Sequence, residues 1–145
     1  MKTILGASVL VICLSAVYGL VDEKDFSPKL VALAHSLHTT CLGISGCKEE
    51  QVGLLKQGKF ENPAECEGKY VSCLWTASGL MNSNLDVNRK LLEELMPDSV
   101  KGTETSIYNS CLEETKKQGE KDFNKEVWFL MKCIYNADPK NFIMF

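Results

Sequence analysis

The sequence predicts an all-α fold, and three observations support this prediction. Apolar residues recur at helical spacing in segment after segment of the chain. Residues that begin or end helices, such as capping side chains, prolines and glycines, separate these segments. No segment shows the sustained alternation and tight glycine turns that predict a β-hairpin. We therefore expect six helices joined by short connections, with no sheet.

The N-terminal residues 1–19 have the features of a secretory signal peptide. Lys2 supplies a positive charge, an apolar run extends to Val17, and a small-residue exit predicts cleavage after Gly19. The apolar run is too short for a comfortable membrane span, so we expect no membrane anchor. The remainder, residues 20–145, is then one secreted, extracellular domain.

Two helices are expected in the first part of this domain. Ser27 is a capping residue, and Pro28 suits the first helical position that follows it. The apolar stripe of this first helix consists of Leu30, Leu33, Leu37 and Cys41. Gly43 and Gly46 are expected to end the helix near its cysteine. The next segment begins with acidic residues and predicts a short second helix that stops at Gly58.

The third and fourth helices follow. Asn62 and Pro63 repeat the cap-plus-proline signal, and the third helix is expected to close at Gly79. Its apolar face consists of Cys66, Tyr70, Cys73, Leu74 and Ala77. The fourth helix is expected within residues 85–96, where leucines line one side and charged residues the other. Pro97 ends it.

The last two helices carry one cysteine each. Thr103 is the expected cap of the fifth helix, which has Cys111 in its middle. The sixth helix is expected from about Asp122 to Asn136, and Pro139 stops it. The apolar side of the sixth helix consists of Phe123, Val127, Trp128, Phe129, Leu130, Met131, Cys133 and Ile134.

The cysteine count favours disulfides over metal. Cys13 would leave with the signal peptide, and the even number that remains in a short exported chain favours three bridges. The cysteines of the domain are Cys41, Cys47, Cys66, Cys73, Cys111 and Cys133. A zinc site would require close C-x-x-C pairs with histidines at matched spacing, and neither is present, so no metal is expected. These residues alone do not choose the pairing.

Charge and histidine placement exclude further classes of function. The formal net charge is −3 and no basic stripe exists, so no nucleic-acid partner is expected. His35 and His38 share one helix without an accompanying acidic motif, which makes ordinary helix surface their expected role. We expect no catalytic residues, no cofactor and no enzyme activity.

Two motifs identify the family that the sequence resembles. The segments KYVSCLWTASGLMNSN and FLMKCIYNADPKNF, with the cysteines, helices and apolar tail, resemble the insect odorant-binding protein family. This is the pheromone- and general-odorant-binding group of secreted six-helix carriers, and the resemblance covers essentially the whole mature chain. Lys69 and Asn124 stand where the family has its second and fifth cysteines. The chain is therefore similar to the reduced-cysteine type, with an extra cysteine pair.

The resemblance implies a disulfide-stapled six-helix domain around an apolar cavity. The implied pairs are Cys41–Cys73, Cys111–Cys133 and Cys47–Cys66. The family bond between the third and the last helix is absent. We expect the cavity walls to move apart more freely for this reason and to tolerate a broader range of ligands.

The resemblance also implies a function: reversible binding of small hydrophobic ligands, such as odorants or pheromones, in the cavity. The apolar tail is the best candidate wall, because large apolar residues at a free carboxyl end are not expected to lie in water. Each other candidate can equally be core packing. The expected ligand contacts are Tyr70, Leu74, Trp75, Ala77, Ser78, Tyr108, Val127, Trp128, Met131, Phe142, Ile143, Met144 and Phe145. Four hydroxyl groups are candidates to orient a ligand: Tyr70, Thr76, Ser78 and Tyr108.

Two alternatives stay open. Relatives with this fold in saliva, venom, haemolymph or reproductive glands sequester mediators, and the sequence pattern does not separate them from olfactory carriers. A secreted interaction protein would instead use its tail in a homodimer. A chemosensory receptor is a further partner that the resemblance allows. The resemblance also allows acid release through the Phe145 carboxylate with His35 or His38, because histidine titrates in the relevant pH range.

Overall fold

The computed structural model describes residues 23–60 and 65–144. The expected signal peptide, the Asn62–Pro63 cap and Phe145 lie outside these residues. Within them the chain forms six α-helices and no β-strand, so the all-α, disulfide-stapled prediction is confirmed. The elements are η1 (Glu23–Asp25), α1 (Pro28–Ser45), α2 (Glu49–Lys56), α3 (Glu65–Ala77), α4 (Arg89–Leu95), α5 (Lys101–Gln118) and α6 (Phe123–Ala137).

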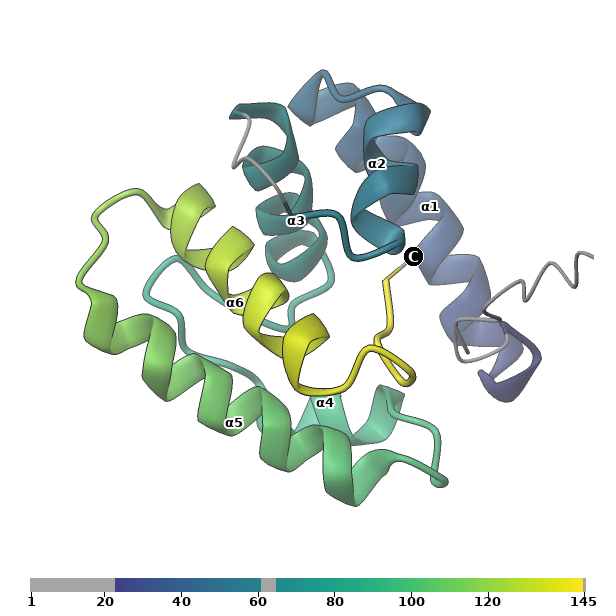
Figure 1. Ribbon diagram of the computed structural model, residues 1–145. Coiled ribbons are helices and arrows are strands. Elements are labelled where there is room, and N and C mark those ends of the chain that lie inside the picture. Colours follow the sequence, from purple (N-terminus) through teal and green to yellow (C-terminus); the bar gives the residue numbers. More distant parts are fainter. Residues whose placement is uncertain (1–22, 61–64, 145) are drawn as a thin grey trace, which may run out of the picture.

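Helix α3 lies at the centre of the arrangement. It packs against α1 and α2 on one side and against α6 on the other, and α6 in turn packs against α5. Figure 1 shows α5 and α6 lying side by side, with α1 and α2 on the opposite side of α3. After α6 the chain turns back, and the C-terminal segment runs from the end of α6 toward α1 (Figure 1). This route brings the tail to the apolar side of α1.

Helix α1 is longer than expected because only one of its two glycines ends it. The Ser27 side chain caps the start by accepting a hydrogen bond from the Leu30 N–H at 3.3 Å. Gly43 stays inside the helix, where a glycine costs about 1 kcal/mol relative to alanine. Gly46 has a φ of 71° and its N–H donates to the Leu42 carbonyl at 3.0 Å, which terminates α1.

The turn before α4 occupies the place where the sequence predicts the first turn of that helix. The Asn82 side-chain oxygen holds this turn by accepting hydrogen bonds from the N–H groups of Asn84 and Asp86, at 2.9 and 3.0 Å. Leu85 has a φ of 59°, which lies in the left-handed region and outside any α-helix. The helix therefore begins later than the expected range of 85–96.

Helix α5 begins at Lys101, before the expected cap at Thr103. The Pro97 carbonyl accepts hydrogen bonds from the N–H groups of Val100 and Lys101, at 3.1 and 3.0 Å, so the chain is already turning there. Val100 occupies the cap position without a side-chain hydrogen bond. Backbone turn bonds, rather than a capping side chain, therefore start this helix.

Three disulfides fasten the helices. Cys41–Cys73 joins α1 to α3, Cys47–Cys66 joins the segment after α1 to α3, and Cys111–Cys133 joins α5 to α6. These are the pairs that the family resemblance implies. No disulfide within the described residues joins α3 to α6.

A close helix contact occupies the region where the family bond between α3 and α6 is missing. Gly68 on α3 is buried, and a Cβ atom placed on it would lie 3.0 Å from the Asn124 carbonyl oxygen on α6. The neighbouring Lys69 is exposed. The absence of a side chain at Gly68 therefore lets the two helices meet more closely than any other residue would allow.

Candidate functional site

An apolar cavity of about 110 Å³ lies between the first helix, the third and fourth helices, and the C-terminal tail. Single side chains from α5 and α6 complete its wall. The lining residues are Phe26, Leu30, Leu33, Ala34, Leu37, Leu74, Trp75, Ser78, Leu80, Leu92, Leu95, Met96, Tyr108, Met131, Ile143 and Met144. None of the lining side chains that the structure describes is charged, so the cavity suits an uncharged apolar molecule.

About half of the ligand contacts expected from sequence meet at this cavity. They come from α3, α5, α6 and the tail, which are far apart in the sequence and adjacent in space. These residues are Leu74, Trp75, Ser78, Tyr108, Met131, Ile143 and Met144. The Trp75 and Tyr108 rings lie with centroids 5.7 Å apart and form one aromatic corner of the wall.

The other expected contacts lie elsewhere. Val127 and Trp128 are buried in the core, and Ala77 is exposed at the end of α3. Tyr70 is buried between helices, and Phe142 packs in an aromatic cluster outside the cavity lining. Phe145 lies outside the residues that the structure describes.

Two walls of the cavity were not identified as ligand contacts from sequence. They come mainly from α1 and α4, whose apolar stripes were visible at helical spacing. The missed residues are Phe26, Leu30, Leu33, Ala34, Leu37, Leu80, Leu92, Leu95 and Met96. A stripe shows which side of a helix avoids water, but it does not show whether that side meets other side chains or a hollow.

The indole N–H and one hydroxyl group of the cavity wall form hydrogen bonds within the protein. The Trp75 Nε1–H donates to the Met131 sulfur at 3.1 Å. The Ser78 hydroxyl donates to the Trp75 carbonyl at 3.0 Å and accepts from the Leu80 N–H at 3.3 Å. Thr76, another expected orienting group, is exposed and donates to the Ser72 carbonyl at 2.8 Å.

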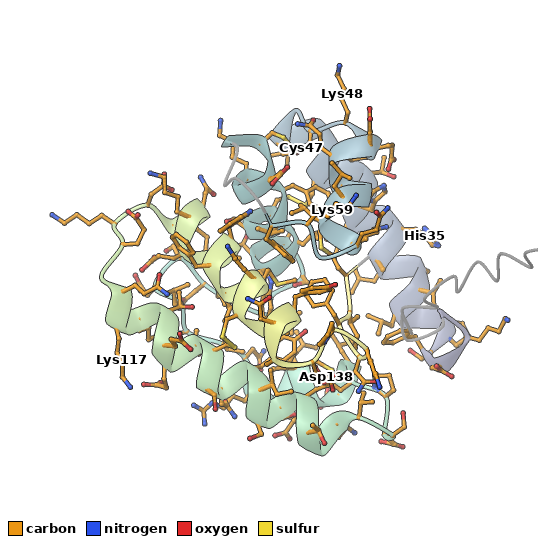
Figure 2. All side chains as sticks on the ribbon, viewed as in Figure 1. His35, Cys47, Lys48, Lys59, Lys117 and Asp138 are labelled. Carbon is orange, nitrogen blue, oxygen red and sulfur yellow. A yellow bond between two sulfur atoms is a disulfide. The ribbon has the colours of Figure 1, made fainter. Side chains whose placement is uncertain are left out.

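His38 is a structural link, which corrects the expectation that both histidines form ordinary helix surface. Its Nδ1 lies 2.7 Å from the Tyr70 hydroxyl on α3, and its Nε2 lies 2.9 Å from a Glu49 oxygen on α2. Burial, together with the charge of Glu49, raises the pKa of the Tyr70 phenol, so this group stays a donor. His35 is exposed and points away from the helices (Figure 2). The His38 link joins three helices on the side of α3 that faces α1.

The tail is anchored just before it reaches the cavity. Asp138, which lies where α6 gives way to the tail (Figure 2), accepts hydrogen bonds from the N–H groups of Lys140 and Asn141 at 3.2 and 3.3 Å. Phe142 is 1% exposed, and its ring centroid lies 5.2 Å from that of Tyr135 and 5.9 Å from that of Phe60. These contacts fix the position from which the last residues extend along the cavity.

A buried carboxyl group lies near this anchor. Glu104 on α5 is 0% exposed, and neither of its carboxyl oxygens has a hydrogen-bond partner among the described residues. Burial raises the pKa of Glu104 to about 7, and the negative charge of Asp138 adds to the rise. Glu104 in turn adds to the effect of burial in raising the pKa of the Tyr108 phenol. Sequence reasoning gave no signal for this group.

The described residues offer neither a membrane-spanning helix nor a cluster of metal ligands. No helix there is both long enough and apolar enough to cross a membrane. In the same part of the chain, no three histidine, cysteine or acidic side chains gather in a way that could hold a metal ion.

Comparison with known proteins gives one family. The sequence pattern of the PBP/GOBP family matches residues 23–137, which is most of the chain. This is the odorant-binding group that the motifs around Cys73 and Cys133 resemble, and its members are secreted proteins that bind small hydrophobic ligands. No curated protein matches the chain.

Proposed function

Because the chain belongs to the PBP/GOBP family, we propose that it is a secreted carrier that binds odorants, pheromones or related lipophilic molecules. The ligand occupies the cavity between α1, α3, α4 and the tail and leaves it unchanged, since no covalent step is needed. Residues 1–19 act as the signal peptide, and the mature domain begins at residue 20. The ligand contacts are the lining residues of the cavity, including Ile143 and Met144 of the tail.

The composition of the cavity wall is the observation that carries this proposal. Within residues 23–60 and 65–144, the sixteen lining residues include no charged side chain and only two with hydroxyl groups, Ser78 and Tyr108. Transfer of a ligand from water into such a site is favourable by about 25 cal/mol for each Å² of apolar surface buried. Met96, Met131 and Met144 add flexible side chains that adapt to differently shaped ligands.

The volume of the cavity favours a compact ligand. An apolar cavity of about 150 Å³ is known to stay dry and to bind benzene, and the cavity described here is of similar size at about 110 Å³. A single-ring or short-chain molecule therefore fits without rearrangement. Longer ligands require part of the wall to move. The tail and α4 are the parts that can do so, because neither element carries a disulfide.

Displacement of a fluorescent apolar probe from the purified domain tests the carrier function. The double variant Ile143→Ser/Met144→Ser removes two apolar contacts from the wall, so we expect the probe to bind about tenfold more weakly or worse. Ile44→Ser is the matched control, because Ile44 is 67% exposed on α1 and does not line the cavity.

Two results would contradict the carrier function. The first is equal probe binding by the wild type and the tail variant. The second is loss of self-association in the tail variant with no effect on the probe, which would support an interaction protein instead. The tissue of expression then distinguishes an olfactory carrier from a salivary, venom, haemolymph or reproductive-gland relative.

A further inference from the structure

The hydrogen bonds of the cavity wall define which polar group a ligand can meet. Among the described side chains of the wall, only Trp75, Ser78 and Tyr108 carry a hydrogen-bonding N–H or O–H group. The Trp75 indole is already paired with the Met131 sulfur, and the Ser78 hydroxyl both donates and accepts within its own turn. These two groups are therefore unable to hold a ligand without breaking a bond of the protein.

Tyr108 differs from both. It lines the cavity from α5 and is 7% exposed, and no other described residue forms a hydrogen bond with its hydroxyl group. Its oxygen is also not among the buried atoms that are sealed without a partner, unlike both oxygens of Glu104. The hydroxyl group of Tyr108 is therefore the one polar side-chain group of the described wall that is available to a ligand.

The chemistry of this group sets the chemistry of its partner. The Tyr108 phenol stays protonated because burial raises its pKa, so this lining residue keeps an O–H donor. An unpaired donor in an apolar site is unfavourable, and a ligand oxygen relieves this cost. A carboxylate ligand would bring a charge into a wall whose described residues include no cationic side chain, and this burial is strongly unfavourable.

We propose that Tyr108 selects neutral, compact ligands with one acceptor oxygen, such as a ketone, ester or alcohol, by donating a hydrogen bond to that oxygen. This inference rests on the proposed carrier function and on the same cavity. Tyr108 orients the end of the ligand that carries the oxygen. The other end touches only apolar side chains, so the shape of the cavity orients it.

Three small molecules with the same number of heavy atoms test this selection. Acetophenone carries an acceptor oxygen, isopropylbenzene replaces the carbonyl group by CH and methyl, and benzoate replaces the ketone by a charged carboxylate. Affinities are measured by isothermal titration for the wild type and for Tyr108→Phe. We expect Tyr108→Phe to bind acetophenone about tenfold more weakly and isopropylbenzene within about twofold of the wild type. Benzoate is expected to bind neither protein.

Tyr70→Phe is the matched control, because it removes a hydroxyl that lies outside the cavity lining. We expect this change to leave the ratio of acetophenone to isopropylbenzene affinity unchanged. A second measurement needs no variant: the infrared carbonyl band of acetophenone bound to the wild type should lie at lower frequency than in a hydrocarbon solvent, as for any hydrogen-bonded ketone.

The outcomes separate this inference from the function on which it rests. If the wild type binds isopropylbenzene, but Tyr108→Phe leaves acetophenone binding unchanged or the carbonyl band is unshifted, the role of Tyr108 is wrong and the carrier stands. Tight benzoate binding would also overturn the proposed ligand class. If the wild type binds none of the three molecules and no fluorescent probe, both the carrier and the role of Tyr108 are wrong.

Discussion

Helix α3 meets its two neighbours in different ways. Toward α1 it is fastened by covalent bonds, Cys41–Cys73 directly and Cys47–Cys66 at the segment that follows α1. Toward α6, no disulfide joins the described residues. The two helices instead meet at Gly68, which has no side chain and therefore lets the α6 backbone come close. A missing bond is therefore not the same as a loose contact, because a glycine gives α3 and α6 a close approach that a larger residue would prevent.

This comparison changes where the adjustable wall of the cavity lies. The absence of the family bond between α3 and α6 predicts, from the sequence alone, that these two walls move apart more freely. The structure packs them closely at Gly68 and links them again through the Trp75 indole and the Met131 sulfur. Helix α4 and the tail have no disulfide, so we now expect the movement that admits larger ligands to occur there.

Loss of the disulfide between α1 and α3 should have the largest effect on stability. Replacing Cys41 and Cys73 together by alanine removes the bond between α1 and α3 and leaves no unpaired thiol. We expect the free energy of unfolding to fall by roughly 2–5 kcal/mol, as measured by urea denaturation. A fall well below 1 kcal/mol would mean that packing alone holds α1 against α3.

The close contact between α3 and α6 should be sensitive to a single added methyl group. Gly68→Ala places a Cβ atom 3.0 Å from the Asn124 carbonyl oxygen, which is too close without a shift of the α6 backbone. We expect a loss of about 1–3 kcal/mol in the free energy of unfolding. Gly43→Ala in α1 is the matched control, because its Cβ atom meets nothing within 4 Å, and a gain of about 0.5–1 kcal/mol is expected. Equal effects of the two changes would show that the contact is not tight.

The buried Glu104, which lies on α5, should make the free energy of unfolding depend on pH. Its folded pKa of about 7 lies above the ordinary value of 4.5, so the stability that it contributes is fully present below about 4.5. This contribution is lost as the pH rises from about 4.5 through 7, and it stays lost above that. We expect the wild type to lose on the order of 2 kcal/mol relative to Glu104→Gln between pH 5 and pH 8.

Thermal unfolding over this pH range measures the difference. Glu93→Gln serves as the control, because it makes the same substitution at an exposed position on α4. Parallel pH profiles for the wild type and Glu104→Gln would show that the buried carboxyl does not titrate differently in the folded protein.

We expect the smallest change in the free energy of unfolding when a single tyrosine hydroxyl is removed, and two such hydroxyls can be compared. The Tyr70 hydroxyl is bonded to His38 at 2.7 Å between α1 and α3, whereas the Tyr135 hydroxyl on α6 donates to the Gln57 carbonyl at 3.3 Å in an exposed position. We expect Tyr70→Phe to lower the free energy of unfolding by about 1 kcal/mol and Tyr135→Phe to lower it by less than half as much. A larger effect at Tyr135 would contradict the proposed link between α1 and α3.

Sequence reasoning predicted the helices well where local signals act alone. The Ser27 cap, the Gly46 stop and the apolar side of α6 are properties of a few neighbouring residues, and they gave the right elements. The start of α4 was missed because Asn82 closes a turn through its own side chain, which competes with helix formation.

The site was predicted less completely than the fold. Trp75 and Trp128 lie on apolar helix faces and look alike in the sequence, yet only Trp75 borders the cavity. Which face is hollow depends on how α1, α4 and the tail come together, and no local pattern encodes this arrangement. Glu104 was missed for the same reason, because its burial and the charge of Asp138 that acts on it arise from the fold rather than from its neighbours in sequence.

The contrast between the two tryptophans gives the most direct test of the ligand site. The chain contains only these two, so the NMR spectrum of the folded domain has two indole N–H signals, which Trp75→Phe assigns. During titration with acetophenone, we expect the Trp75 signal to shift and the Trp128 signal to stay in place. A shift of Trp128 alone, or of neither signal at saturating ligand, would contradict a ligand site between α1, α3, α4 and the tail.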